Sequence, residues 1–390
     1  MIRGQTARGL DMDGWDLNRV SGGGPLPRRP KRGVLSHGPK IALSLLVGAV
    51  VLVAACGTTA PASTPSSASA TPTATPPTNV SFAYQVGYNY GMYYVAQQHG
   101  WLKSEGINLS PMTIFQSGPP ELDALLAGQF DVAVLGFVPV LTLANEVPGT
   151  LRVIDVVDNS GTTYSLVAQK GITSVADLRG KTVAVTVGSN YEYFLDQVLA
   201  KYGMTESDIH VVNAQPNDGQ AAFTAGRVDA VVPATIDTQS LVAQTPGSHV
   251  LFSGDQFTAS PNPSPNPFAI YDLVVTSTAF ANAHPALLTK LIQVFHEKVT
   301  PYVSDHFTSA ATDILNWQTN VVKATVTLAQ VEAGLKGYDF YSIPQVQQIM
   351  AGGLLKTSLT SVSQYLVSAK LLPSVPDLST LIDPQYVNAA

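Results

Sequence analysis

Short apolar runs alternate along the chain with longer segments of helical pattern. The predicted strands are 80–86, 108–115, 132–135, 153–157, 181–187 and 271–275, and the predicted helices are 91–99, a segment opening at Pro119, 191–202 and a long helix from His284. Strands that alternate with helices predict an α/β fold in which sheets of mostly parallel strands carry helices on both faces.

One stretch of this pattern occurs twice. Residues 124–134 read ALLAGQFDVAV and residues 222–232 read AFTAGRVDAVV, with the shared form A-x-x-A-G-x-x-D-[VA]-[AV]-V. Each copy predicts a helix end, a glycine cap, an Asp-bearing turn and a buried strand, although other helix-to-strand turns can look similar. The repeat predicts two equivalent lobes. Segments 136–139 and 233–235, which follow the repeated strands, would then face each other across a ligand cleft.

The chain begins with a different pattern. A basic segment at 28–32 precedes the uncharged run 41–55, which is too short to span a bilayer comfortably but suits a secretory signal. The run ends at Cys56, the only cysteine, and Val53-Ala-Ala-Cys-Gly57 resembles a bacterial lipobox, in which the thiol receives a diacylglycerol. The alternative is a membrane-anchoring helix with an incidental cysteine.

We therefore expect a signal peptide with an N-terminal extension at 1–55, and a lipidated Cys56 followed by a disordered linker over 56–78. Residues 57–78 consist only of Gly, Thr, Ala, Pro and Ser, a composition that favours an extended tether. Residues 1–55 hold eight Lys or Arg and three Asp, so the remaining chain has 13 basic and 24 acidic residues, a net charge of about −11. This charge argues against a nucleic-acid partner.

Enzyme signatures are missing from the sequence. It contains no G-x-S-x-G, no H-E-x-x-H and no G-x-x-x-x-G-K motif, and its seven histidines form no short metal-binding pair. We therefore expect no catalytic activity, no metal and no cofactor.

Several segments, in chain order, resemble the nitrate-, sulfonate-, taurine- and thiamine-precursor-binding proteins of bacterial ABC importers. The segments are YVAQQHGWLKSEGI at 94–107, AGQFD at 127–131, SVADLRGKTVA at 174–184, GSN at 188–190 and AGRVD at 225–229. One departure weakens the case for a sulfonate or taurine: many sulfonate-binding relatives carry a tryptophan where this chain has PATIDT at 233–238.

The resemblance implies a two-lobed periplasmic-binding-protein fold of type II. Lobe one would comprise 79–167 plus 268–390 with its C-terminal helices, and lobe two 168–267. Crossover strands near 165–167 and 273–275 would allow hinge closure. The implied function is an extracytoplasmic solute-binding lipoprotein that captures a small organic, anionic solute (sulfonate-, taurine- or nitrate-like, or a pyrimidine precursor).

The implied partners are the solute, an ABC permease with its ATPase, and the membrane through the lipid anchor. The protein would be a monomer on the outer face of the bacterial cytoplasmic membrane. Two alternatives stay open: an enzyme of the same fold acting on a small heteroaromatic substrate, and an adhesive or sensor lipoprotein without transport.

The turns between strands and helices supply the predicted site. Gly188-Ser189-Asn190 opens a helix, so its amides suit an anion, although Ser189 or Asn190 could equally cap that helix. We place 116–118 at the equivalent turn of lobe one and interpret Asn217-Asp218 as a helix cap. Tyrosines crowd these turns, and no lysine or arginine falls in them. The predicted ligand-binding residues are Tyr88, Asn89, Ser117, Gly136, Gly188, Ser189, Asn190, Tyr191 and Thr235.

Overall fold

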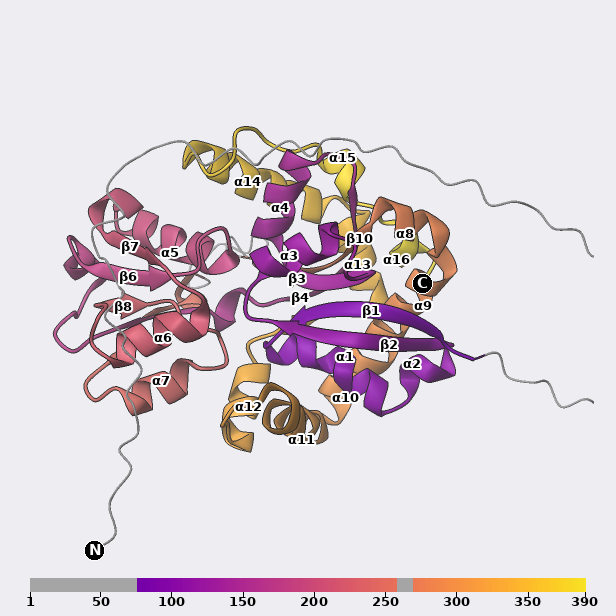
Figure 1. Cartoon of the computed structure of the whole chain (residues 1–390), viewed down its shortest axis with the longest axis horizontal. Coiled ribbons are helices and arrows are strands. Elements are labelled where there is room, and N and C mark those ends of the chain that lie inside the picture. Colours follow the sequence, from indigo (N-terminus) through magenta and orange to yellow (C-terminus); the bar gives the residue numbers. More distant parts are fainter. Residues whose placement is uncertain (1–75, 258–268) are drawn as a thin grey trace, which may run out of the picture. The chain divides into compact units, whose positions relative to one another are not determined.

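The computed structural model describes residues 76–257 and 269–390 (Figure 1). The predicted signal peptide, Cys56 and most of the predicted linker lie outside the described residues. Within the described ranges, no helix has both the length and the apolar character needed to cross a membrane.

The first sheet has the strand order β11-β4-β10-β3-β1-β2. Its strands are β1 (Thr78–Gln85), β2 (Ile107–Phe115), β3 (Val132–Gly136), β4 (Leu151–Asn159), β10 (Tyr271–Ser277) and β11 (Asp339–Phe340). Strand β1 is parallel to β2 and β3, whereas β10 runs antiparallel to both β3 and β4.

The second sheet has the order β7-β6-β8-β5-β9. Its strands are β5 (Ser165–Ala168), β6 (Thr182–Val185), β7 (His210–Asn213), β8 (Ala230–Val231) and β9 (His249–Ser253). Strand β6 is parallel to β7 and β8, and β5 is antiparallel to β8 and β9. The run β2-β1-β3-β10-β4 therefore matches β7-β6-β8-β5-β9, and the predicted pair of equivalent α/β units is confirmed.

Two details differ from the sequence prediction. Both sheets are mixed rather than mostly parallel, because β10 and β11 in the first sheet and β5 in the second run opposite to the other strands. The two strands expected to cross between the lobes each pair within a single sheet. Strand β10 pairs only in the first sheet. Strand β5 pairs only in the second sheet, although the predicted boundary at 167/168 assigns most of β5 to lobe one. The chain passes between the sheets at 160–164, and β9 of the second sheet is followed in chain order by β10 of the first.

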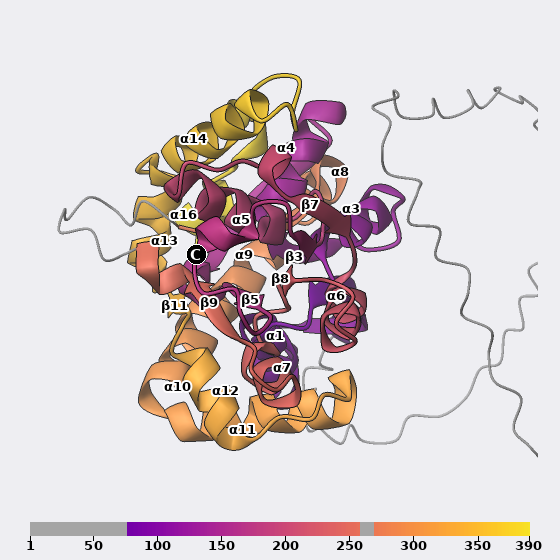
Figure 2. The same ribbon diagram turned by 90° about the vertical axis from the view of Figure 1, so that its left-hand side faces the viewer.

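Helices cover both faces of the sheets. The helix bounds are α1 (Tyr88–Gln98), α2 (Trp101–Ser104), α3 (Gly118–Leu126), α4 (Phe137–Glu146), α5 (Asn190–Lys201), α6 (Pro216–Thr224), α7 (Thr238–Gln244), α8 (Thr278–Ala283), α9 (Pro285–Val294), α10 (Thr300–Asp305), α11 (Phe307–Trp317), α12 (Leu328–Leu335), α13 (Ile343–Met350), α14 (Leu354–Ser368), α15 (Leu378–Leu381) and α16 (Gln385–Asn388). In the second sheet, α5 connects β6 to β7 and α6 connects β7 to β8, so the two connections run in opposite directions across the sheet. Because both connections are right-handed, α5 and α6 lie on opposite faces of the sheet (Figure 2). The C-terminal region is mainly helical, as predicted, and α13, α15 and α16 pack against β4.

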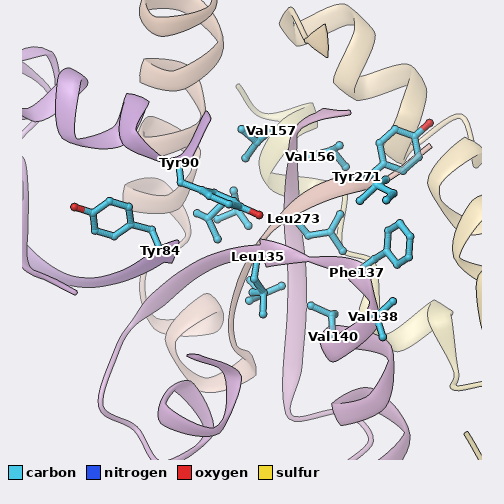
Figure 3. Close-up of a cluster of buried hydrophobic side chains, with 14 of the residues drawn as sticks. Tyr84, Tyr90, Leu135, Phe137, Val138, Val140, Val156, Val157, Tyr271 and Leu273 are labelled. Atoms are coloured by element: carbon cyan, nitrogen blue, oxygen red, sulfur yellow. The ribbon is translucent and has the colours of Figure 1, made fainter. Parts of the chain in front are cut away.

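The core of the first sheet is formed by β3, β4, β10 and helix α4. Leu135 of β3, Leu273 of β10 and Val156 of β4 are fully buried and gather with side chains of α4 (Figure 3). Full burial of one such side chain contributes about 1.5–3 kcal/mol. Because β10 follows the whole second lobe in the chain, this core joins segments that are far apart in sequence.

The repeated motif has the same geometry in both lobes. Two residues after α3 and α6 end, Gly128 (φ +70°) and Gly226 (φ +67°) adopt the left-handed conformation that glycine adopts without strain. Asp131 accepts the Ser81 N–H at 2.8 Å, and Asp229 accepts the Thr182 N–H at 2.8 Å. Each aspartate therefore fastens its turn to the neighbouring strand, which gives the repeat a structural reason.

A second repeat, which was not predicted from the sequence, follows the equivalent strands β1 and β6. Gly87-Tyr-Asn-Tyr90 opens α1 after β1, and Gly188-Ser-Asn-Tyr191 opens α5 after β6. The turn at 188–190 is thus equivalent to 87–89. The predicted equivalence of 188–190 with 116–118 is wrong, because the counterpart of 116–118 is the turn at 214–216 before α6.

Candidate functional site

The two sheets meet where β1, β3 and β6 end and where the helices that follow them begin. Asn190, the first residue of α5, reaches across to α4, and its Oδ1 accepts the N–H of Val138 at 3.0 Å. Ser117 Oγ donates to Oε1 of Gln215 at 2.7 Å. Ser117 and Gln215 are the N-caps of the equivalent helices α3 and α6, so the two lobes touch through matching positions.

Two adjoining cavities lie at this junction. The first, of about 10 Å³, is lined by Gln85, Tyr90, Gly118, Gly136, Pro139, Tyr164, Ser189, Asn190 and Tyr191. The second, of about 20 Å³, is lined by Gln85, Val86, Gly87, Asn89, Tyr90, Ser160, Thr163, Tyr164, Tyr191, Thr235, Asp272 and Tyr338. They share Gln85 and three tyrosines, but each has room for only about one water molecule. An organic solute could therefore occupy both only after the lobes move apart. A larger, more open groove beside α6 and α7 contains none of the predicted ligand-binding residues.

The structure brings six of the predicted residues together around these cavities. The six are Asn89, Gly136, Ser189, Asn190, Tyr191 and Thr235. The other three do not line them. The Tyr88 ring lies against Gly334, Ser117 is turned to Gln215, and the Gly188 N–H donates to Oε2 of Glu192 at 2.8 Å.

The turn at 188–190 is already hydrogen-bonded within the protein. Ser189 Oγ accepts the Tyr191 N–H at 3.1 Å and donates to the Thr186 carbonyl at 2.6 Å, so the cap interpretation of Ser189 is confirmed. Burial raises the pKa of Glu192, which accepts the Gly188 N–H, to about 7. The predicted cap at Asn217-Asp218 is wrong, because these residues lie inside the first turn of α6 and Gln215 is its N-cap.

Two buried aspartates belong to the same junction and were missed from the sequence. In the strand register, Asp272 of β10 lies opposite Gly136 on one side and opposite Asp158 of β4 on the other. Because β10 is antiparallel, its first residues lie at the edge where β3 and β4 end. The segments around Asp158 and Asp272 were interpreted only as buried strands, since strand direction cannot be read from the sequence.

Helix α1 supplies hydrogen-bond donors to this aspartate pair. Asn89 Nδ2 donates to Asp158 Oδ2 at 2.8 Å and to Asp272 Oδ2 at 2.9 Å, and the Tyr90 hydroxyl donates to Asp272 Oδ1 at 2.6 Å. Burial raises the pKa of Asp158 well above its usual value, and the charge of Asp272 raises it further. Burial also raises the pKa of Asp272. We therefore expect the two carboxyls to share one proton at neutral pH.

Aromatic rings form much of the remaining wall. The Tyr164 and Tyr191 ring centroids are 5.4 Å apart, and both rings line both cavities. Burial raises the pKa of each of these hydroxyls, and of Tyr90 and Tyr338, so all four stay protonated and can donate hydrogen bonds. The second repeat is the signal that could have identified Tyr90, which occupies the position equivalent to Tyr191.

Asp272 is the one acidic side chain among the described residues that line the two cavities. Gln85 Nε2 donates to Oε2 of the buried Glu121 at 2.9 Å, and burial raises the pKa of Glu121 well above its usual value. None of the described residues that line the two cavities is Lys or Arg. Nor do residues 76–257 and 269–390 contain a group of three or more His, Cys, Asp or Glu side chains placed to hold a metal ion.

Comparison with known proteins identifies the family of this chain and relatives that share its sequence. The family model described as "NMT1/THI5 like" matches residues 88–305. The taurine-binding periplasmic protein of Escherichia coli (strain K12) is 25% identical over 316 residues, which cover 79% of this chain and 92% of that protein. A Brucella abortus (strain 2308) protein named as a binding protein is 28% identical over 136 residues. That alignment covers 35% of this chain and 41% of the Brucella protein, less than half its length.

Solved structures share the fold at lower identity. The alkanesulfonate-binding protein SsuA from Xanthomonas axonopodis pv. citri bound to MOPS matches with a TM-score of 0.65 and 20% identity, covering 80% of this chain and 100% of that one. The desulfurization enzyme DSZB matches with a TM-score of 0.55 and 15% identity, covering 80% of this chain and 98% of that one. The periplasmic-binding-protein fold is therefore shared by binding proteins and by at least one enzyme.

Proposed function

The chain belongs to the NMT1/THI5-like family, and on this premise we propose that it is the solute-binding component of an ABC importer. The observation that carries the proposal is the pair of cavities lined by polar and aromatic side chains from both sheets, including Asn89 and Asn190 at equivalent helix starts. Relatives named as taurine- and aliphatic sulfonate-binding proteins support a role in solute capture.

In this proposal the solute is bound between the lobes and handed on without chemical change. Two connections join the sheets, so one lobe can rotate against the other and enclose the solute. The bonds from Asn190 to Val138 and from Ser117 to Gln215 join residues of different lobes and would form only on closure. The partners are then a permease and its ATPase.

The proposed location is outside the cytoplasmic membrane. The lipobox-like segment ending at Cys56 and the tether over 57–78 support a diacylglycerol anchor on the outer face of that membrane. We also propose that the protein is not an enzyme. We do not retain the predicted negative charge of the solute, because Asp272 lines the second cavity and no Lys or Arg lines either one.

A thermal-shift panel followed by calorimetry tests the proposal. A solute present at a hundred times its dissociation constant stabilises the native state by about 2.7 kcal/mol, which is easily detected as a rise in Tm. We expect one solute class to bind in a 1:1 complex and to be recovered intact. Turnover without a stoichiometric complex would instead indicate an enzyme, and no shift with any solute would favour an adhesive protein.

The site assignment needs a matched pair of variants on one helix. Tyr191 near the start of α5 lines both cavities, whereas Tyr202, just after its end, is 45% exposed. Tyr191→Ala should weaken solute binding by about tenfold or more through lost ring contact, and Tyr202→Ala should leave it unchanged. Equal affinities for the two variants would mean that the solute binds elsewhere.

A further inference from the structure

The chemistry of the second cavity points to a particular class of solute. We infer that the cleft binds organic cations, namely solutes that present a protonated amine or amidine to Asp158 and Asp272. This inference rests on the proposed solute-binding function and specifies its ligand.

The first argument is that a hydrogen-bonding atom left unpaired at the second cavity accepts hydrogen bonds rather than donates them. Asn89 lines the second cavity with its side chain fully buried, and its Nδ2 is committed to both aspartates, which fixes the orientation of the amide. Its Oδ1 is left without a partner among the described residues, and so is Oδ1 of Asp158. Oδ1 of Asn89 can only accept. A solute that satisfies it must donate a hydrogen bond, as an ammonium or amidinium group does.

The second argument is electrostatic. Asp272 is 1% exposed and lines the cavity, and no described lining residue carries a positive charge. A sulfonate placed here would meet a carboxylate without compensation, whereas a cation would complete a buried ion pair. Tyr90, Tyr164, Tyr191 and Tyr338 line the same cavity, and aromatic rings can attract cations through their faces.

The third argument concerns the helix starts, which would otherwise favour an anion. The protein's own acids already occupy them: Glu192 accepts the Gly188 N–H at the start of α5, and Asp272 is bonded by Asn89 and Tyr90 of the first turn of α1. In the first cavity, Nδ2 of Asn190 is buried without a partner and is a donor. A solute with an amine at one end and an acceptor at the other would match the polar atoms of both cavities once the lobes open.

Matched solutes test the inference by calorimetry. Taurine and isethionate both carry a sulfonate, but taurine has an ammonium group where isethionate has a hydroxyl. Benzamidine and benzenesulfonate share a ring and differ in charge. We expect taurine to bind about ten- to a hundred-fold more tightly than isethionate, and benzamidine to exceed benzenesulfonate by a similar factor. Equal or reversed affinities within a pair would overturn the inference. If none of the four binds while another solute does, the inference fails and the proposed function stands.

A variant tests the aspartate itself. Asp272→Asn keeps the shape and removes the charge, so benzamidine binding should fall about ten- to a hundred-fold. The control is Asp218→Asn, an exposed carboxylate in α6 outside both cavities, which should bind like the wild type. Unchanged binding by a folded Asp272→Asn protein would refute the assignment.

Proton release gives a readout that needs no variant. A cation that pairs with Asp158 and Asp272 should displace their shared proton, so calorimetry in buffers of different ionisation enthalpy should detect release of up to about one proton with benzamidine. The other titratable groups facing the pair are Tyr90, Tyr93, Glu121, Tyr164, Tyr191, Tyr338, Asp339 and Tyr341. The tyrosines have raised pKa values and stay protonated. No buffer dependence in wild type, or the same release from Asp272→Asn, would contradict the pairing.

Discussion

Replacement of Gly136 by alanine should hold the lobes apart. Gly136 has an extended backbone (φ −70°), so alanine costs nothing in backbone strain. A Cβ at this position would lie 2.5 Å from Cγ of Asn190, about 1 Å closer than an ordinary contact. Asn190 would have to withdraw, and its bond to the Val138 N–H would break.

The magnitude follows from that broken bond. A buried N–H left without a partner costs about 1–3 kcal/mol, and this cost falls on the closed form alone. Solute affinity, which scales with the population of the closed form, should therefore drop by about 5- to 150-fold. The stability of the protein to urea without solute should change much less. Gly219→Ala in α6, where a Cβ would make only ordinary contacts, is the matched control and should bind normally.

A double-mutant cycle decides whether the clash is the cause. Asn190→Ala removes the atoms that alanine at 136 would meet, so adding Gly136→Ala to it should cost little further affinity. Calorimetry on the four proteins measures the coupling, and small-angle scattering with solute measures closure. Wild-type affinity in Gly136→Ala, or a full additional loss in the double variant, would refute the reasoning.

Three further outcomes are expected. Ser189→Ala removes the α5 cap and should lower the unfolding free energy in urea by about 1 kcal/mol, whereas the exposed Ser207→Ala should not. Burial alone would lower the pKa of His296, but the charge of Asp155 and their hydrogen bond raise it above 6.5. Stability from this pair should be complete below about pH 6.5 and decline as pH rises through the raised pKa, and His296→Asn should flatten that profile. Labelled fatty acid should enter the wild type and not Cys56→Ala; equal labelling would exclude the anchor.

The sequence predicted the two-lobed fold because the helix-to-strand motif occurs in both lobes, with glycine and aspartate at the same places. It could not give strand direction, since apolar runs look alike in parallel and antiparallel strands. The mixed sheets and the position of β10 between β3 and β4 were therefore missed.

The missing strand direction also explains why only part of the candidate site could be predicted. Turn residues such as Asn190 and Tyr191 could be predicted, because they follow strands directly. Asp158 and Asp272 could not, because they reach the junction only through the register of β4 and β10. The anionic solute was inferred from free amides at 188–190, and Glu192, four residues after Gly188, had already taken one of them.

The central position of β10 also sets an order of assembly. Strands β3 and β4 do not pair with each other; both pair with β10, which lies more than a hundred residues after β4. All strands of the second sheet, in contrast, fall within 165–253. As the chain emerges with its N-terminus first, the second lobe can fold while the first is still an incomplete sheet. Truncation before residue 271 should therefore leave a folded second lobe joined to an unfolded first one.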